Sequence, residues 1–158
     1  MSGWRQKWSA AMADKALGLL GLMRRAGAIE LGVDNTASAL RAGKAKLLLL
    51  SCDAAESAKR KLDILSEGRR ALTVPLPYTR EELASGLGVS GCSAAAVTDI
   101  GFANALMKEL AAEDPVRYTE TAQEIARRCE KTARRKKETA ARKGIRGTTR
   151  GGQKNGHD

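Results

Sequence analysis

Four consecutive leucines, Leu47–Leu50, restrict the folds open to this chain more than any other feature. The run has the length of a β-strand and lies between a basic glycine-containing stretch, residues 43–46, and Ser51. Side chains of a strand point alternately to opposite faces, so a strand that is apolar on both faces must be covered on both. The run therefore predicts a sheet with a layer packed against each side.

The neighbouring segments supply the other strands and the helices. Short strands are predicted at Ile29–Leu31, 71–77 and 93–98, the second of these interrupted by prolines. Helical spacing of apolar residues predicts helices at 4–26, 34–42, 52–65 and 101–112, and Thr79 with Glu82 forms a capping box for a helix at 79–85. This alternation predicts an α/β protein with helices on both faces of a small sheet.

Positive charge is concentrated in the C-terminal part of the chain. The 158 residues contain 28 Lys and Arg and 18 Asp and Glu, a formal net charge of +10. Residues 115–158 hold 13 of the cations and 5 of the acids, so residues 1–114 are nearly neutral. A basic segment on a nearly neutral globule is typical of proteins with a polyanionic partner. Nucleic acid is the favoured candidate, since the large apolar face of a membrane-surface helix is missing.

Cysteine and histidine usage argues against metal chemistry and against secretion. Cys52, Cys92 and Cys129 are odd in number and far apart, which favours free thiols in the reducing cytoplasm. The only histidine is His157, and no zinc or haem spacing exists. The apolar run 16–23 is too short to span a bilayer. We expect a cytoplasmic protein with no metal and no cofactor.

Composition divides the chain into four parts. Residues 1–13 are predicted to be an N-terminal helical extension that contains Trp4 and Trp8, and residues 14–114 the α/β domain. Residues 115–143 have helix formers throughout but only a weak apolar stripe, Val116, Ala122, Ile125 and Cys129, which predicts a solvated basic helix ordered on a partner. Residues 144–158 contain arginine and glycine in low-complexity sequence and are predicted to be disordered.

The stretch that begins at Gly32 has the features of a ligand-binding helix start. Free N–H groups and the helix dipole favour an anionic or electron-rich ligand there. The side chains of Asp34 and Asn35 offer acceptors for the amino and imino groups of a base edge such as guanine. The alternative is that Asp34 or Asn35 merely caps the helix. Three following cations are expected to hold phosphates: Arg41, Lys44 and Lys46.

From residue 14 to residue 111 the sequence resembles the kink-turn-binding ribosomal protein family. The resemblance rests on the opening RRAG…LG, the passage GKAKLLLL and the segment REEL…LG, and VTDIGFA is most similar to small bacterial members. The family also has archaeal large-subunit, snoRNP and spliceosomal members. The resemblance implies a three-layer α-β-α sandwich around a mixed four-stranded sheet.

The resemblance also implies an RNA site made of two segments. A helix start that contacts the sheared G·A pairs of a kinked RNA falls on Gly32, Val33, Asp34, Asn35 and Thr36. A loop that closes over an extruded nucleotide falls on Val89, Ser90, Gly91, Cys92 and Ser93. Without the resemblance, this second segment would be interpreted as a plain glycine connection. Cys92 is interpreted as an incidental small residue rather than a nucleophile, because no histidine or other activating group accompanies it.

The chain departs from the family pattern within this site. Ser38 stands where a lysine is usual, Asp34 where Asn, Lys or Glu is usual, and Asn35 where Glu or Gln is common. Arg41 lies one helical turn after Ser38, and we hypothesise that it replaces the missing cation.

The basic segment after residue 114 is expected to bind RNA without sequence preference. The alternative is a solvated segment that only raises solubility. The cations concerned are Arg127, Arg128, Lys131, Arg134, Arg135, Lys136, Lys137, Arg142 and Lys143.

Together these features predict a non-enzymatic, monomeric RNA-binding protein that recognises a structured, kinked RNA and is ribosomal or ribosome-associated. Its partners would be rRNA or another kinked RNA, and ribosomal proteins, but no membrane. The alternative is a protein-interaction module on the same fold in which RNA binding is weakened or lost. A fragment of an RNA methyltransferase is disfavoured, because residues after Asp114 contain no cofactor loop.

Overall fold

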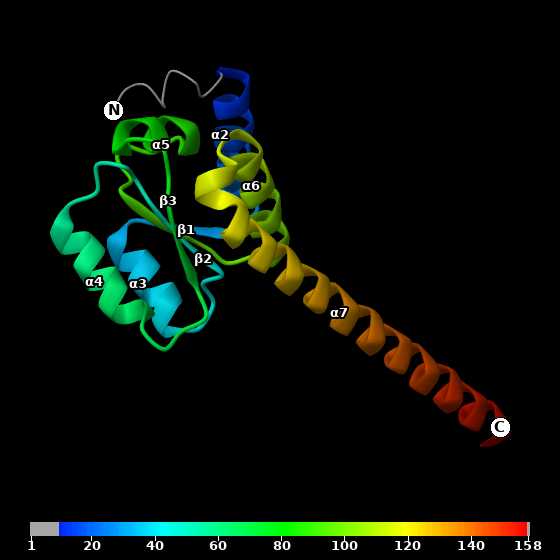
Figure 1. Cartoon of the computed structure of the whole chain (residues 1–158). Helices are drawn as coiled ribbons and strands as arrows, with labels where there is room; N and C mark the ends of the chain where they lie inside the picture. The colour runs from blue at the N-terminus through cyan, green and yellow to red at the C-terminus, as the bar shows by residue number, and fades with distance from the viewer. Residues whose placement is uncertain (1–9, 158) are drawn as a thin grey trace.

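The computed structural model describes the backbone of residues 10–157 and the side chains of residues 15–143 (Figure 1). Trp4, Trp8 and the side chains of 144–158 lie outside the described part. The elements in chain order are α2 (Ala10–Arg25), β1 (Ile29–Leu31), α3 (Val33–Arg41), β2 (Leu47–Leu50), α4 (Glu56–Ser66), β3 (Leu72–Pro75), α5 (Arg80–Leu87), β4 (Ala94–Val97), α6 (Ile100–Glu113) and α7 (Pro115–His157).

The four strands form one mixed sheet in the order β1-β4-β2-β3. Strand β4 is antiparallel to both of its neighbours, with Ala95 opposite Leu31 on one side and Leu49 on the other, whereas β2 and β3 are parallel. All four leucines of β2 are buried, as the apolar run predicts. The mixed four-stranded sheet is therefore confirmed.

Helices cover both faces of the sheet, and the β2 leucines alternate between the two cores. Leu48 packs with Leu40 of α3 and Leu62 of α4 on one face. Leu47 belongs to the larger core on the other face, which α2, α5, α6 and the first turns of α7 complete. The three-layer α-β-α sandwich is confirmed, and Figure 1 shows its two helical layers on either side of the strands.

Two helix boundaries in the described part of the chain differ from the sequence prediction by two residues or more. Helix α4 begins at Glu56 rather than near residue 52, because residues 51–54 form a turn that closes on itself, with the N–H of Ala54 donating to the carbonyl of Ser51. Helix α5 continues to Leu87, where Gly88 ends it in the left-handed conformation. The capping box between Thr79 and Glu82 is confirmed.

The start of α7 belongs to the core, so the prediction of a helix that is solvated throughout is wrong for its first turns. Tyr118 and Ile125 are buried against the rest of the larger core. The Tyr118 hydroxyl donates a 2.6 Å hydrogen bond to the carbonyl of Pro75. Val116, assigned to the apolar stripe, is 99% exposed. The core therefore continues across the predicted boundary at residue 114.

At the other end of the domain, α2 runs unbroken from Ala10 to Arg25, across the predicted boundary at residue 13. Helix α7 extends to His157, and the predicted disorder of residues 144–158 stays a prediction. Within the described residues, no helix combines the length and hydrophobicity of a membrane span. Nor does that part of the chain contain a group of three His, Cys, Asp or Glu placed to hold a metal ion.

Candidate nucleic-acid interface

The two segments implied by the family resemblance lie side by side at one edge of the sheet. The N–H of Gly32 donates a 2.8 Å hydrogen bond to the carbonyl of Ala94, the residue that follows the 89–93 loop. Strands β1 and β2 end at this edge and β4 begins there, so residues 32–36 and 89–93 are adjacent. We call this surface the Gly32 edge. A single ligand can touch both segments.

Gly32 has a backbone conformation that only glycine adopts readily. Its φ of 93° and ψ of 159° lie in a region closed to residues with a side chain. A Cβ atom at this position would meet nothing within 4 Å, so there is room for a side chain. Glycine is required here because of the backbone conformation alone. Gly32 is the N-cap of α3, and no side chain caps this helix. The interpretation of Asp34 or Asn35 as the cap is therefore wrong, and the first N–H groups of α3 are available to a ligand.

Asp34 and Asn35 point into solvent at the start of α3. The Asp34 side chain is 96% exposed and pairs with Lys61 of α4 across 3.3 Å. The Asn35 amide nitrogen donates a 2.8 Å hydrogen bond to the carbonyl of Leu31, which turns its oxygen outward as an acceptor. Acceptors from two neighbouring side chains are thus presented together, beside a cation.

Two of the expected contact residues are buried and do not reach a ligand. Thr36 is 0% exposed beneath the first turn of α3. Cys92 is also buried, and its Sγ donates to the carbonyl of Ala94 at 3.4 Å. Both side chains support the edge from below. In the 89–93 loop, Ser90 and Gly91 are exposed, whereas Ser93 is half-buried and Val89 is half-buried against the core.

The environment of Cys92 also argues against nucleophilic chemistry. Burial raises the pKa of the Cys92 thiol, although hydrogen bonds with the backbone of Gly32 and Ala94 act in the opposite direction. A raised pKa leaves the thiol protonated at neutral pH, and the protonated form is a poor nucleophile. This agrees with the sequence interpretation of Cys92 as an incidental small residue.

We predict a large difference in reactivity between the cysteines. Cys52 is exposed at the Gly32 edge, whereas Cys92 is buried with a raised pKa. Iodoacetamide at neutral pH should alkylate Cys52 at least tenfold faster than Cys92, which should react only after unfolding. Peptide mass spectrometry of timed samples measures both rates. Equal rates in the folded protein would show that the 89–93 loop is open rather than packed.

A third segment, residues 51–53, lies at the same edge and was not predicted from the sequence. The N–H of Ser51 donates to the carbonyl of Ser93, and that of Cys52 to the carbonyl of Tyr78. Partial burial acts to raise the pKa of the Asp53 carboxyl, but hydrogen bonds, chiefly from the N–H of Arg80, lower it on balance. Asp53 therefore adds an ionised acceptor to the edge. The sequence signal that could have predicted this segment is its position directly after β2, because β2 ends at the same end of the sheet as β1.

Arg41, Lys44 and Lys46 lie at the opposite end of the sheet, which corrects the expectation that they stand beside Asp34. Helix α3 runs from one edge to the other, and its nine residues span about 14 Å. The N–H of Lys46 donates to the carbonyl of Val97, the last residue of β4. Exposed Ser38 is midway along α3. We call this opposite end the Lys46 edge.

Among the nine predicted tail cations, Arg127 and Arg128 have structural partners. Both form ion pairs with Glu124, and these hydrogen bonds from Arg127 and Arg128 lower the pKa of the Glu124 carboxyl. Arg128 is 22% exposed and also donates to the carbonyl of Arg70 at 2.6 Å. The other seven are exposed: Lys131, Arg134, Arg135, Lys136, Lys137, Arg142 and Lys143.

Arg24 fixes the start of the 89–93 loop. Its guanidinium donates to the carbonyl of Leu87 at 2.8 Å and lies 3.4 Å from that of Gly88. These contacts tie the last turn of α2 to the end of α5. Arg24 therefore has a packing role in this fold.

A mixed four-stranded sheet between helical layers, with a glycine-led helix start beside a small-residue loop, defines an α-β-α sandwich with a polar surface at the Gly32 edge. The chain matches the ribosomal protein L7Ae/L30e/S12e/Gadd45 family over residues 14–107, and it belongs to that family. Membership supports, at the level of the family, an RNA-binding protein of ribosomal type. The proteins of this family are structural proteins rather than enzymes.

A solved structure of similar fold is that of a protein with unknown function from Bacillus halodurans C. It is 28% identical in sequence to this chain, with a TM-score of 0.56. The match covers 60% of this chain and 95% of that one. The α/β fold is therefore shared with a chain that consists almost entirely of the matched region.

Proposed function

We propose that this protein binds a kinked RNA at the Gly32 edge and acts, without catalysis, as a cytoplasmic ribosomal or ribosome-associated protein. The observation that carries the proposal is the hydrogen bond from Gly32 to Ala94, which joins the two implied contact segments into one surface. A kinked RNA presents base edges and an unstacked nucleotide close together, and such features are the usual targets of sequence-specific RNA binding.

The chemistry of the edge suits this ligand. The outward oxygens of Asp34 and Asn35 accept hydrogen bonds from guanine imino and amino groups, and the uncapped N–H groups of α3 attract electron-rich atoms. Lys61 places a cation beside Asp34. It compensates for the absence of a lysine at Ser38 more directly than Arg41 does, because Arg41 lies toward the other end of α3.

The 89–93 loop supplies the second half of the interaction. Exposed Ser90 and Gly91 present little side-chain bulk, so an unstacked base packs closely against their backbone. Val89 adds an apolar contact while it packs against the core. The protein binds the bent conformer in preference to the extended one, and this differential affinity shifts the RNA population toward the bend.

A comparison of two RNAs tests the proposal. One is a kink-turn RNA, and the other is the same RNA with its tandem G·A pairs replaced by Watson–Crick pairs. Filter binding or fluorescence anisotropy at fixed salt should give at least a tenfold higher affinity for the kink-turn. Equal affinities would contradict kink recognition, and no binding to either RNA would favour the protein-interaction alternative.

The exposed cations far along α7 are expected to add affinity without specificity. Replacing Arg134, Lys136, Lys137, Arg142 and Lys143 with glutamine in the full chain keeps Tyr118 and Ile125 in the core. The slope of log affinity against log salt should fall by about 0.9 for each phosphate that the protein no longer neutralises. An unchanged slope would show that this part of α7 does not touch the RNA.

A further inference from the structure

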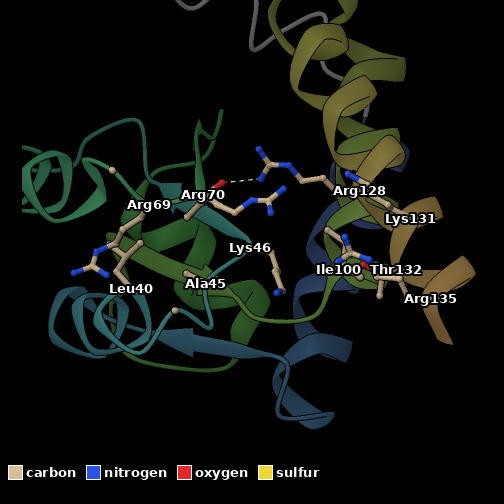
Figure 2. Close-up of a pocket in the computed structure, with 13 residues that line it drawn as sticks. Leu40, Ala45, Lys46, Arg69, Arg70, Ile100, Arg128, Lys131, Thr132 and Arg135 are labelled. Atoms are coloured by element: carbon tan, nitrogen blue, oxygen red, sulfur yellow. Dashed lines mark hydrogen bonds between the residues drawn. The ribbon is translucent and has the colours of Figure 1, made fainter. Parts of the chain in front are cut away.

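A cavity of about 440 Å³ at the Lys46 edge separates the sheet domain from α7 (Figure 2). One wall is formed by the end of α3, the loop before β2 and the loop before β3, and the other by α7. Its lining includes six cations, Lys46, Arg69, Arg70, Arg128, Lys131 and Arg135, and no carboxylate. We call it the basic groove.

Two of these cations hold the groove in shape. Arg128 is partly buried and bonds both Glu124 on its own helix and the carbonyl of Arg70 across the groove. This second bond, the dashed line in Figure 2, ties α7 to the loop before β3. The Nε of Arg69 donates to the carbonyl of Leu65 at 2.6 Å. The walls are therefore fixed by internal contacts.

The other four cations have no carboxylate partner in the part of the chain whose side chains are described. They are Lys46, Arg70, Lys131 and Arg135. In Figure 2 the side chain of Arg70 extends toward α7, which presents Lys131 and Arg135 on the opposite wall. Like charges held close together repel one another, and an anion between them relieves that repulsion. The groove is thus suited to a polyanion.

The spacing of the cations favours a chain of phosphates over a single one. Arg128, Lys131 and Arg135 follow one another at about one helical turn, or roughly 5 Å, along α7. They form a track beside Arg70 and Lys46 and do not converge on one point. A track of positive charge matches the repeated charges of a sugar–phosphate backbone.

The groove and the Gly32 edge lie at opposite ends of the same sheet. Strands of four residues separate them by about 13 Å, a distance shorter than one turn of a nucleic acid duplex. The exposed face of α3, with Asn35, Ser38 and Arg41, runs between the two surfaces. One RNA molecule is long enough to contact both.

We propose that the basic groove binds the phosphate backbone of a helical arm of the same RNA whose kink occupies the Gly32 edge. This inference rests on the function proposed above. It assigns Arg41, Lys44 and Lys46, which do not stand beside Asp34, to the path of that arm. It also gives α7 a specific place on the RNA, beyond general attraction.

The test uses the full chain and two kink-turn RNAs that differ only in the length of one arm. A short arm of roughly 4 base pairs barely crosses the sheet, whereas a long arm of roughly 12 passes the groove. The groove variant carries Lys46→Gln, Arg70→Gln, Lys131→Gln and Arg135→Gln, and retains Arg128 and Arg69. The control variant loses the same charge elsewhere, by Lys15→Gln, Lys59→Gln, Arg60→Gln and Lys108→Gln.

The groove variant should bind the long-armed RNA at least tenfold more weakly than the control variant, with a salt slope smaller by about 2 to 4. The two variants should bind the short-armed RNA within about twofold of each other. Equal affinities for the long-armed RNA, or an equal loss on both RNAs, would overturn the proposal. Circular dichroism melting checks that both variants fold, as substitutions of side chains outside the core should allow.

Failure of the proposed function gives a different result. Replacing the tandem G·A pairs of the long-armed RNA would then leave wild-type affinity unchanged, whatever the groove variant does. A groove variant that still binds this RNA more weakly than the control variant would support phosphate binding in the groove. If the groove variant and the control variant bound this RNA with equal affinity, the proposal that the groove binds phosphates would be overturned.

Discussion

Replacing Ile125 with alanine should lower the free energy of unfolding by about 2 to 5 kcal/mol, the usual range for a buried aliphatic side chain. Ile125 is 0% exposed between α7 and the larger core, although it lies in the basic segment. The loss comes from the contacts of the removed methyl and methylene groups and from the cavity that they leave. Chemical denaturation followed by circular dichroism measures it.

Val116→Ala is the matched control for this substitution. Val116 and Ile125 fall on the same predicted stripe, yet Val116 is 99% exposed, so its truncation should change stability by less than about 0.5 kcal/mol. Similar small effects at both positions would show that α7 is detached from the domain in solution. The account of the basic groove would then fail as well, because α7 forms one of its walls.

Replacing Gly32 with alanine should remove most of the affinity for a kink-turn RNA, by at least tenfold. A Cβ atom is strained at a φ of 93° and ψ of 159°, at a cost of about 1 to 3 kcal/mol. The backbone relieves the strain by rotating, and this moves the start of α3 away from the 89–93 loop. Anisotropy titration with the kink-turn RNA measures the affinity, and thermal melting confirms that the variant is folded.

Gly27→Ala provides the comparison. Gly27 also has a positive φ, 70°, and a Cβ atom there would likewise meet nothing within 4 Å, but it precedes β1 at the far end of that strand. The substitution should destabilise the fold by a similar mechanism while the folded protein keeps its affinity. If both substitutions weakened RNA binding equally, the effect would be one of stability, and the Gly32 edge would lose its support as the binding surface.

Local patterns predicted the sheet well. The leucines of β2 allow only a strand covered on both faces, and the capping box of α5 needs only two residues three positions apart. The family resemblance placed Gly32 and the 89–93 loop in one site, and the hydrogen bond between Gly32 and Ala94 joins them. Whether these residues bind RNA stays a prediction.

The errors arose where distance along the chain and distance in space diverge. Arg41, Lys44 and Lys46 follow Asp34 closely in sequence, but a helix of nine residues carries them to the other edge. Lys61 is 27 positions from Asp34 and nevertheless pairs with it. No periodicity reports such a contact, because it depends on how α3 and α4 pack together.

The first turns of α7 were misassigned for a related reason. Their apolar residues are sparse, and the burial of Tyr118 depends on a surface made by α6 and on the carbonyl of Pro75. The predicted apolar stripe included Val116, which is exposed, and left out Tyr118, which is buried. With that choice of residues the helix appears to be solvated. The cations beyond these turns then appear to form one uniform tail, although Arg128 bridges to Arg70.

Energy transfer between fluorophores on the two arms of a kink-turn RNA tests the central claim most directly, under conditions in which the free RNA is mostly extended. Addition of the full-length protein should raise the transfer efficiency for the kink-turn RNA and leave that of the RNA without tandem G·A pairs unchanged. An equal change for both RNAs, or binding to the kink-turn with no change in transfer, would contradict selection of the bent conformer at the Gly32 edge.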